Sequence, residues 1–322
     1  MGVNVAENGD IWICDGPGNQ MLYFPGGKVQ DGKIVKVEGL DSPFDVIIDA
    51  QNRVWVNNSA SNTLVRFPAS DPSKVETFHA GLSVRALALD QKGNLWVTSN
   101  LSPDFPAPKM PPHATIMEQF KIIAGAALMD PKPTGVVNMI QPDGTQVVPG
   151  GYTGNGTVDA PWGVNIDGNG DVWVGMIKNR SIVVLAGDDT KGHPAGTKAG
   201  DLIHQFTGGN IQMITDVNID PAGDVWIANN WNSIDAATAE SPVFATSTWG
   251  GGSGLTVIYG VASPVKRCES TSEERSAVKR HPTFCGSRGR VTAPATRWRS
   301  PASYGRPIRA RSWKRRIQPR RT

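Results

Sequence analysis

The chain has 322 residues, of which 36 are glycine, 10 are tryptophan and 19% are charged, a composition that favours a β-rich protein over a helical one. No hydrophobic run reaches the length of a membrane span, and three cysteines give neither a disulfide framework nor the spacing of a metal site. The net charge of +3 hides two regions: residues 1–262 contain 15 basic and 26 acidic residues, whereas residues 263–322 contain 17 and 3.

Five segments of the chain align without gaps, and each predicts a strand, a tight turn and a second strand. They are residues 3–13, 46–56, 87–97, 164–174 and 217–227. Apolar residues alternate with a period of two in the first strands, which is typical of half-buried strands. The turn column holds residue types that tolerate the positive φ of a hairpin turn. They are Gly9, Asn52, Gly93, Gly170 and Gly223.

One tryptophan occupies the same position in every second strand: Trp12, Trp55, Trp96, Trp173 and Trp226. A buried tryptophan removes about 150–250 Å² of surface from water, so we expect these indoles to form the packing between neighbouring sheets. Further strands are expected at residues 64–67 with 75–78, 136–140 with 145–148, and 182–185 with 202–206. Four short strands in about 40–45 residues are typical of a β-propeller blade.

The predicted fold class is therefore all-β, a propeller with five recognisable four-stranded blades in residues 1–262. Met1 is followed directly by a first strand, so we expect an open or incomplete ring, with six blades in an intact parent. A five-bladed ring is the alternative. An open ring leaves sheet edges exposed, and exposed edges favour aggregation.

Two repeats are lengthened between their second and third strands. Residues 101–134 contain a Pro-rich stretch and an amphipathic helix predicted at 114–129, and residues 231–254 are polar and Gly-rich before a strand predicted at 255–259. In a meander, both connections lie on the side of the ring where the first strands begin. The two insertions are therefore expected to crown one mouth of the central channel, and long loops on a rigid scaffold commonly carry function.

The basic region, residues 263–322, has no apolar periodicity. It is predicted to be a nucleic-acid or polyanion arm, a disordered tail, or the product of a frame change near Val265 and Lys266. The sudden change in composition favours the last of these, so nucleic acid is not the expected partner.

The repeat resembles the NHL-repeat propellers and the related virginiamycin B lyase-like and SMP-30/gluconolactonase-like proteins. The resemblance covers about residues 2–260 and rests on the D-x-x-G-x-h-W-h core, as in Ile166–Val174, and on an asparagine before the third strand, as in Asn19, Asn62 and Asn179. It implies the architecture, whereas the fold itself hosts binding proteins, lactonases and lyases. Relatives of this kind are often exported, but no export signal precedes the first strand of this sequence.

The residues at the start of each first strand are expected to line the channel mouth. One column reads Gly2, Asp45, Ala86, Gly163 and Asp216, and the column before it reads Met1, Phe44, Arg85, Trp162 and Thr215. The gluconolactonase resemblance implies a divalent cation near this point, so Asp45 and Asp216, with Asn58 or Asn229, are candidate ligands for Ca²⁺ or Mg²⁺. The competing interpretation is that both aspartates cap local turns, and Asn58 and Asn229 are themselves expected to cap the turn after the second strand.

Two functions follow from these candidates. The first is a scaffold that binds a small molecule or a protein at the mouth, through Arg85, Trp162, Asp45, Asp216, Lys178 and Asn229. The second is a metal-dependent enzyme of the lactonase or lyase type that uses Asp45 and Asp216. None of the five histidines falls at the start of a first strand, so the sequence offers no positioned base for a lyase.

Overall fold

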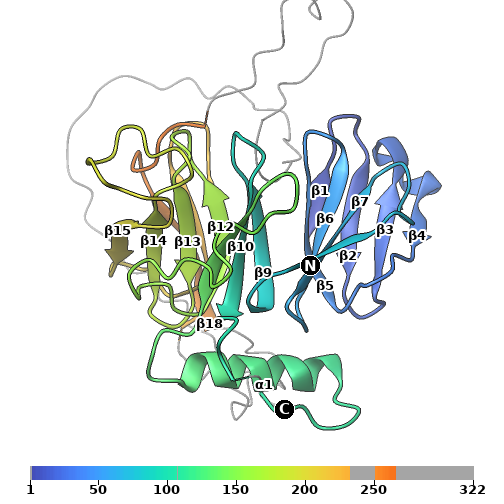
Figure 1. Ribbon diagram of the computed structural model, residues 1–322, viewed down its shortest axis with the longest axis horizontal. Coiled ribbons are helices and arrows are strands. Elements are labelled where there is room, and N and C mark those ends of the chain that lie inside the picture. The colour runs from blue at the N-terminus through green and yellow to red at the C-terminus, as the bar shows by residue number, and fades with distance from the viewer. Residues whose placement is uncertain (1, 107, 233–250, 266–322) are drawn as a thin grey trace, which may run out of the picture. The chain divides into compact units, whose positions relative to one another are not determined.

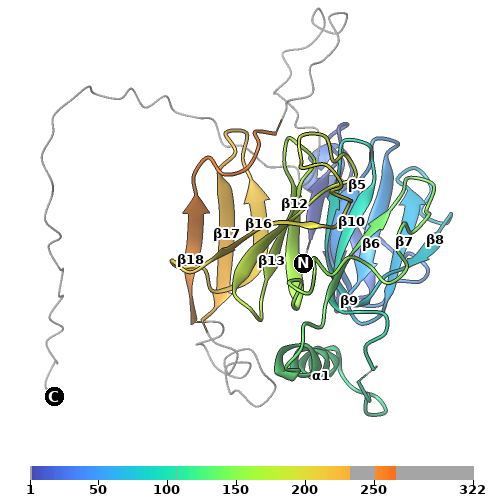
Figure 2. The ribbon, with the colours of Figure 1, turned by 60° about the vertical axis from the view of Figure 1, so that its left-hand side comes forward.

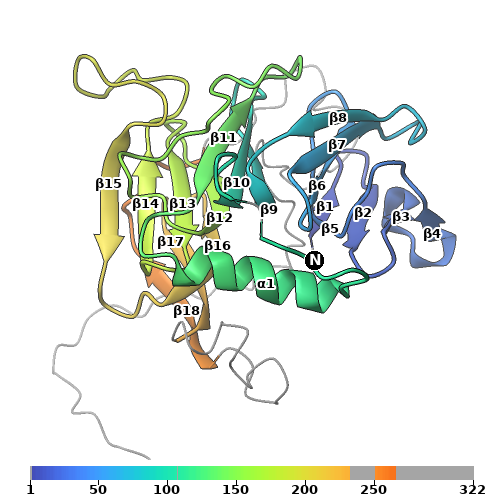
Figure 3. The same cartoon turned by 60° about the horizontal axis from the view of Figure 1, so that its bottom comes forward.

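The structure is a computed structural model that describes residues 2–106, 108–232 and 251–265. In these residues five antiparallel sheets, named blades 1 to 5 in chain order, are arranged around a common axis (Figure 1, Figure 3). The predicted all-β propeller architecture is therefore confirmed for this part of the chain. Residues 266–322 lie outside the described ranges.

Three of the blades have four strands. Blade 1 contains β1 (Val3–Val5), β2 (Ile11–Asp15), β3 (Gln20–Phe24) and β4 (Lys33–Val35), with short 3-10 turns at Pro25–Gly27 and Val29–Asp31. Blade 2 contains β5 (Pro43–Ile48), β6 (Arg53–Asn58), β7 (Thr63–Pro68) and β8 (Glu76–His79). Blade 4 contains β12 (Pro161–Ile166), β13 (Val172–Met176), β14 (Ser181–Leu185) and β15 (Leu202–Thr207).

The other two blades have three described strands each. Blade 3 contains β9 (Leu82–Leu89), β10 (Leu95–Leu101) and β11 (Val136–Ile140), with helix α1 (Ile116–Met129) between β10 and β11. Blade 5 contains β16 (Met213–Ile219), β17 (Val225–Trp231) and β18 (Gly251–Ile258), which lie side by side in Figure 2. The predicted helix in the first insertion is therefore confirmed. Among the described residues, no helix has both the length and the apolar character needed to cross a membrane.

One predicted strand is wrong. Residues 145–148 do not form a strand and instead belong to an irregular segment that touches β11 through two isolated bridges, Val137 with Tyr152 and Ile140 with Gln146. The physical reason is local, since Pro149 has no amide hydrogen for a ladder and Gly151 turns the chain with a φ of +72°. This segment takes the place of a fourth strand in blade 3.

The hairpins of blades 2 to 5 share one hydrogen-bond pattern, built on Asp49, Asp90, Asp167 and Asp220. In blade 2, Oδ1 of Asp49 accepts the backbone amides of Gln51 and Arg53, and Oδ2 accepts the indole Nε1 of Trp55 at 2.9 Å. The same indole bond measures 3.0, 3.1 and 3.0 Å in blades 3, 4 and 5. All five residues of the predicted turn column have a positive φ, from 56° to 89°, as a turn of this kind requires.

Blade 1 departs from this pattern. Ala6 stands where the other blades have aspartate, and Nε1 of Trp12 is buried without a hydrogen-bond partner. A buried unsatisfied donor costs about 1–3 kcal/mol. Blade 1 therefore keeps the indole of the repeat but lacks the carboxylate that satisfies it.

The core lies between the blades, where the indoles of blades 1 to 4 pack against the next sheet. Four of the five repeat tryptophans are at most 3% exposed: Trp12, Trp55, Trp96 and Trp173. Trp226 in blade 5 is only partly buried. The prediction that these indoles form the packing between sheets is confirmed for the first four.

Strand packing joins each blade to the next, from blade 1 to blade 5, and no described strand fills the interval between blade 5 and blade 1 (Figure 3). After β18 the chain returns to the hairpin turns of blades 4 and 5. Ser263 donates its amide to Oδ2 of Asp167 (3.1 Å) and accepts the amide of Gly168 (3.0 Å), and Ala262 donates to the carbonyl of Gly223 (3.1 Å). Residues 266–322 lie outside the described residues, so the three interpretations of the basic tail stay predictions.

Candidate functional site

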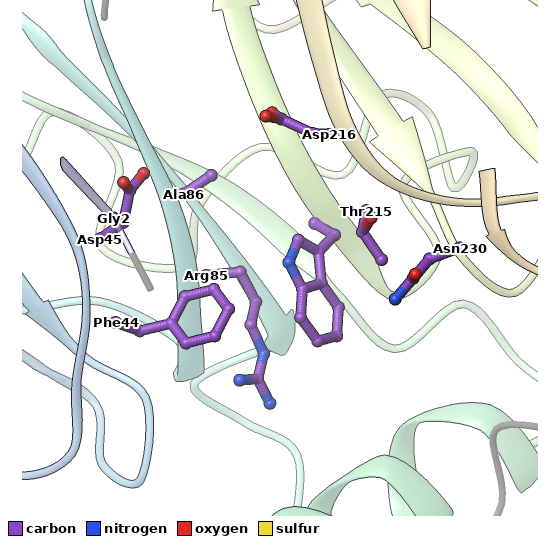
Figure 4. A pocket seen from close by; sticks show the side chains of 9 residues that line it. Gly2, Phe44, Asp45, Arg85, Ala86, Thr215, Asp216 and Asn230 are labelled. Carbon is purple, nitrogen blue, oxygen red and sulfur yellow. The ribbon is translucent and has the colours of Figure 1, made fainter. Parts of the chain in front are cut away.

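A pocket of about 290 Å³ lies where the innermost strands begin. Nine residues line it: Gly2, Phe44, Asp45, Arg85, Ala86, Trp162, Thr215, Asp216 and Asn230 (Figure 4). All except Asn230 belong to the two columns that the repeat alignment places at the channel mouth. The structure therefore brings these predicted residues together, and their role in binding is taken up below.

In blades 2 to 5, a register shift at the start of the first strand turns these side chains toward the pocket. In blade 2 the paired residues are Pro43 with Asn58 and then Val46 with Val56, so Phe44 and Asp45 face a single residue of β6. Blades 3 and 4 show the same two-against-one arrangement at Arg85 with Ala86 and at Trp162 with Gly163, and blade 5 shifts register around Thr215. Bulges commonly re-aim side chains next to functional sites.

Side chains of the second strands satisfy the amides that the bulges leave unpaired. Oδ1 of Asn57 accepts the amide of Asp45 (2.6 Å), and Oγ1 of Thr98 accepts the amide of Ala86 (3.0 Å). Both side chains are fully buried. The bulged backbone of blades 2 and 3 is thus held in place by polar residues from the neighbouring strand.

Arg85 is the central cation of the pocket. Its guanidinium carbon lies 4.5 Å from the ring centre of Trp162 and 5.6 Å from that of Phe44, so the group lies between two aromatic faces (Figure 4). Nε donates to Oδ1 of Asn100 at 2.6 Å, and the side chain is 1% exposed. Burial lowers the pKa of Arg85 to about 9, so the group carries its charge at neutral pH.

Asn100 fixes this arginine, and sequence reasoning did not identify it. Besides accepting from Arg85, Oδ1 accepts the hydroxyl of Ser83 (3.2 Å), and Nδ2 donates to the carbonyl of Pro161 in blade 4 (2.7 Å). Asn100 lies four residues after Trp96, in a position that the repeat alignment treated as the end of the strand. The sequence pattern does not mark Asn100, because its contacts arise only in the fold: β10 continues to Leu101, and Asn100 therefore lies beside β9.

The two pocket carboxylates lie on the other side of the cavity from the guanidinium, which points toward α1 (Figure 4). Asp45 accepts the amide of Val46 with Oδ1 (3.0 Å) and the amide of Leu87 in blade 3 with Oδ2 (3.1 Å). Asp216 accepts the amide of Val217 with Oδ1 (3.0 Å). These bonds support the capping interpretation, with the addition that Asp45 ties two blades together.

Asn58 and Asn229 lie outside the pocket, and each bonds the connection that leads into the first strand of its blade, in place of the predicted cap on the turn after the second strand. In each, Oδ1 accepts a backbone amide, from Asp41 (2.9 Å) or Gln212 (2.9 Å). Each Nδ2 donates to a backbone carbonyl and to a threonine hydroxyl of the third strand. The structure therefore does not bring Asn58 to Asp45 as a metal ligand, and the pocket is lined by Asn230 in place of Asn229.

Lys178, a predicted ligand contact, is also absent from the pocket wall. Its Nζ forms an ion pair with Asp159 (2.9 Å) and donates to the carbonyl of Lys132 (2.6 Å). Lys132 belongs to the first insertion, and both members of the ion pair are 11% exposed. Lys178 therefore anchors the insertion to blade 4.

Helix α1 crosses the insertion-bearing end of the channel (Figure 3). A capping box opens it, since Thr115 accepts the amide of Glu118 and Glu118 accepts the amide of Thr115. Ile123, Ala127 and Leu128 are buried in a cluster that includes Trp162 and Trp231. The first insertion therefore covers the mouth as predicted, while most of the second, residues 233–250, lies outside the described residues.

No protein-family model matches this chain, and no curated protein matches it. Solved structures do match, among them virginiamycin B lyase from Staphylococcus aureus, at 11% identity and a TM-score of 0.40 over 70% of this chain and 76% of the other. A candidate gluconolactonase matches at 14% identity and a TM-score of 0.47, over 71% and 70%. The WD40 β-propeller domain of Doa1 matches at 15% and 0.44, over 69% and 58%. The structural neighbours thus include the kinds of propeller that the repeat resembles, and at these identities and TM-scores they carry no conclusion about activity.

Proposed function

We propose that the propeller binds a small carboxylate-bearing ligand in the pocket at the channel mouth. The observation that carries this proposal is the guanidinium of Arg85, which Asn100 orients between the rings of Phe44 and Trp162 on the pocket wall. A guanidinium matches a carboxylate in geometry and forms charge-assisted hydrogen bonds with it. A cavity of about 290 Å³ suits a small molecule rather than a peptide.

The far side of the pocket narrows the ligand class. Asp45 and Asp216 lie opposite the guanidinium, and carboxylates accept hydrogen bonds from hydroxyl or ammonium groups. A ligand with a carboxylate at one end and hydroxyl or ammonium donors at the other complements both ends. Hydroxy acids and amino acids are the simplest members of this class.

Isothermal titration with benzoate and gluconate, and with benzamide as the neutral match of benzoate, tests the carboxylate requirement. Arg85→Met should weaken binding of the two acids about 10-fold or more, because a hydrogen bond to a charged group contributes about 1.5–3 kcal/mol. Binding should also weaken as the pH rises through about 9, where Arg85 loses its charge. Lys92→Met is the matched control, since Lys92 pairs with Asp188 outside the pocket.

Two results would contradict the proposal: equal binding of benzoate and benzamide, or acid binding that survives Arg85→Met. Circular dichroism of the variant separates loss of binding from loss of fold.

A metal-dependent enzyme of the lactonase or lyase type is the second candidate, supported by the two carboxylates among the residues that line the pocket. Ca²⁺ and Mg²⁺ take oxygen ligands. An ion that binds only the folded protein raises its melting temperature. Asp216→Asn should abolish that rise. Asp216 is preferable to Asp45 for this test, because Asp45 also joins blades 2 and 3.

A further inference from the structure

Every described interface between blades is built in the same way, with the indole of one blade on an apolar face of the next. Trp12 packs among residues of blade 2, with its ring centre 5.4 Å from that of Phe67. The receiving face of blade 2 is at most 1% exposed at Val46, Val54, Val56, Val65 and Phe67. Trp55, Trp96 and Trp173 occupy corresponding clusters on blades 3, 4 and 5. One interface type therefore repeats four times.

Blade 1 carries the same receiving face without a described blade on it. The alignment that pairs Trp55 with Trp12 pairs the receiving residues of blade 2 with Val3, Ile11, Ile13, Leu22 and Phe24. Val3 is 49% exposed, whereas its equivalent Val46 is 1% exposed, and the other four are only partly buried. Ile34 on the outer strand of the same blade is 64% exposed.

Blade 5 carries the opposite half of the interface. Trp226 is partly exposed, although its four equivalents are at most 3% exposed. Val257 lies opposite Trp226 in the ladder and is also partly buried, and Leu255 beside it is 65% exposed. This face presents an indole, as the donating side of every other interface does.

We propose that these two faces receive one further blade of the same repeat, which places its own indole on blade 1 and its own apolar face against Trp226. The two faces are complementary halves of an interface that the molecule already forms four times, so a single blade of this type satisfies both. Gly2 and Asp216 line the pocket from the two sides of the interval. The added blade therefore forms the part of the pocket wall between these two residues. This proposal does not depend on which ligand the pocket binds.

The chain offers its own probe for this site. Residues 161–215, which contain blade 4 and the connection to blade 5, are fused directly ahead of Gly2 in place of Met1. The repeat stays in register, because Thr215 and Met1 occupy the same column. The copied blade brings the indole of Trp173 and the apolar face, with Val164, Val174 and Val183, that packs with Trp96 in the parent.

We expect the fusion to raise the melting temperature by about 5 °C or more and to slow amide exchange in β1–β3 and β17 at least about 10-fold. The matched control is the same fusion with the copied Trp173 changed to serine. A second control is Val3→Arg, which should scarcely change the unfused chain, because Val3 is 49% exposed, and should remove the gain in the fusion.

Three outcomes would overturn the proposal. The fusion melts and exchanges like its serine control, the fusion does not fold while the unfused chain does, or sedimentation shows the unfused chain as a dimer that Trp226→Arg dissociates. In the last case a second copy of the chain covers the faces. Because the fusion tests stability alone, its failure leaves the ligand proposal standing, and failure of the benzoate titration leaves the blade proposal standing.

Discussion

Blade 1 lacks the aspartate that accepts the indole N–H in the other four blades, and replacing Ala6 by aspartate tests whether that hydrogen bond stabilises a blade. In Ala6→Asp, Oδ2 should accept Nε1 of Trp12, which is buried without a partner, as the equivalent carboxylates do in the other blades. Satisfying a buried donor contributes about 1–3 kcal/mol. The gain is reduced because the amide of Asp10 already has an acceptor in Asn8 (3.1 Å), and because a second carboxylate is placed near Asp10.

Blade 4 shows that the fold tolerates such a pair of carboxylates, since Asp167 and Asp171 occupy the two corresponding positions. We expect a net gain of about 1–2 kcal/mol in the free energy of unfolding, or roughly 3–6 °C in melting temperature for a domain of this size. Denaturant and thermal unfolding, followed by tryptophan fluorescence, measure both quantities.

Asp90→Ala is the reverse experiment, because it leaves the fully buried Nε1 of Trp96 without its acceptor, and it should cost about 2–4 kcal/mol. Ala6→Leu is the control for packing, since leucine offers no acceptor and should give no gain. An Ala6→Asp chain that is no more stable than the parent would refute the reasoning.

Two further predictions follow from the backbone and from burial. A Cβ on Gly163 would lie 2.6 Å from Cα of Asp216, so Gly163→Ala should lower the free energy of unfolding by about 1–3 kcal/mol. Gly125→Ala in α1, where a Cβ meets nothing within 4 Å, should instead raise the free energy of unfolding by about 0.5–1 kcal/mol. Equal effects of the two substitutions in denaturant unfolding would contradict the close packing at Gly163. Burial and then Asp167 raise the pKa of Asp171, so the charged form is disfavoured in the folded state. Stability is therefore lost as the pH rises from the ordinary aspartate pKa of about 3.9 through the raised value, and Asp171→Asn should flatten this part of the melting profile; an unchanged profile would refute it.

The sequence predicts the blades and the pocket columns well because both depend on register. A hairpin of fixed length places the positive φ, the indole and the start of the first strand at constant offsets. Phe44 and Trp162 are therefore found on one pocket wall although they are far apart in the chain. The indoles are predicted for the same reason, since one large side chain per repeat must pack between sheets.

The errors arise where the register changes. Against β16, Met213 pairs with Trp231 and Ile214 pairs with Asn229, so Asn230 is an extra residue of β17, and it lines the pocket in place of Asn229. A bulge adds one residue and reverses which side chains face inward, and nothing in the one-letter pattern marks it. Lys178 and Asn58 were candidates by residue type, and each is held by partners, Asp159 and Thr63 among them, that only the fold brings near.

The bonds of Ala262 and Ser263 to the hairpin turns of blades 4 and 5 have a practical consequence for measurement. Those turns join first to second strands, whereas α1 joins a second to a third strand, so the two features lie at opposite ends of the channel. A sensor surface or reporter attached at Val265 would approach the protein from the side away from Arg85. Immobilised binding assays can therefore use that point without placing the surface against the insertion-bearing end of the channel.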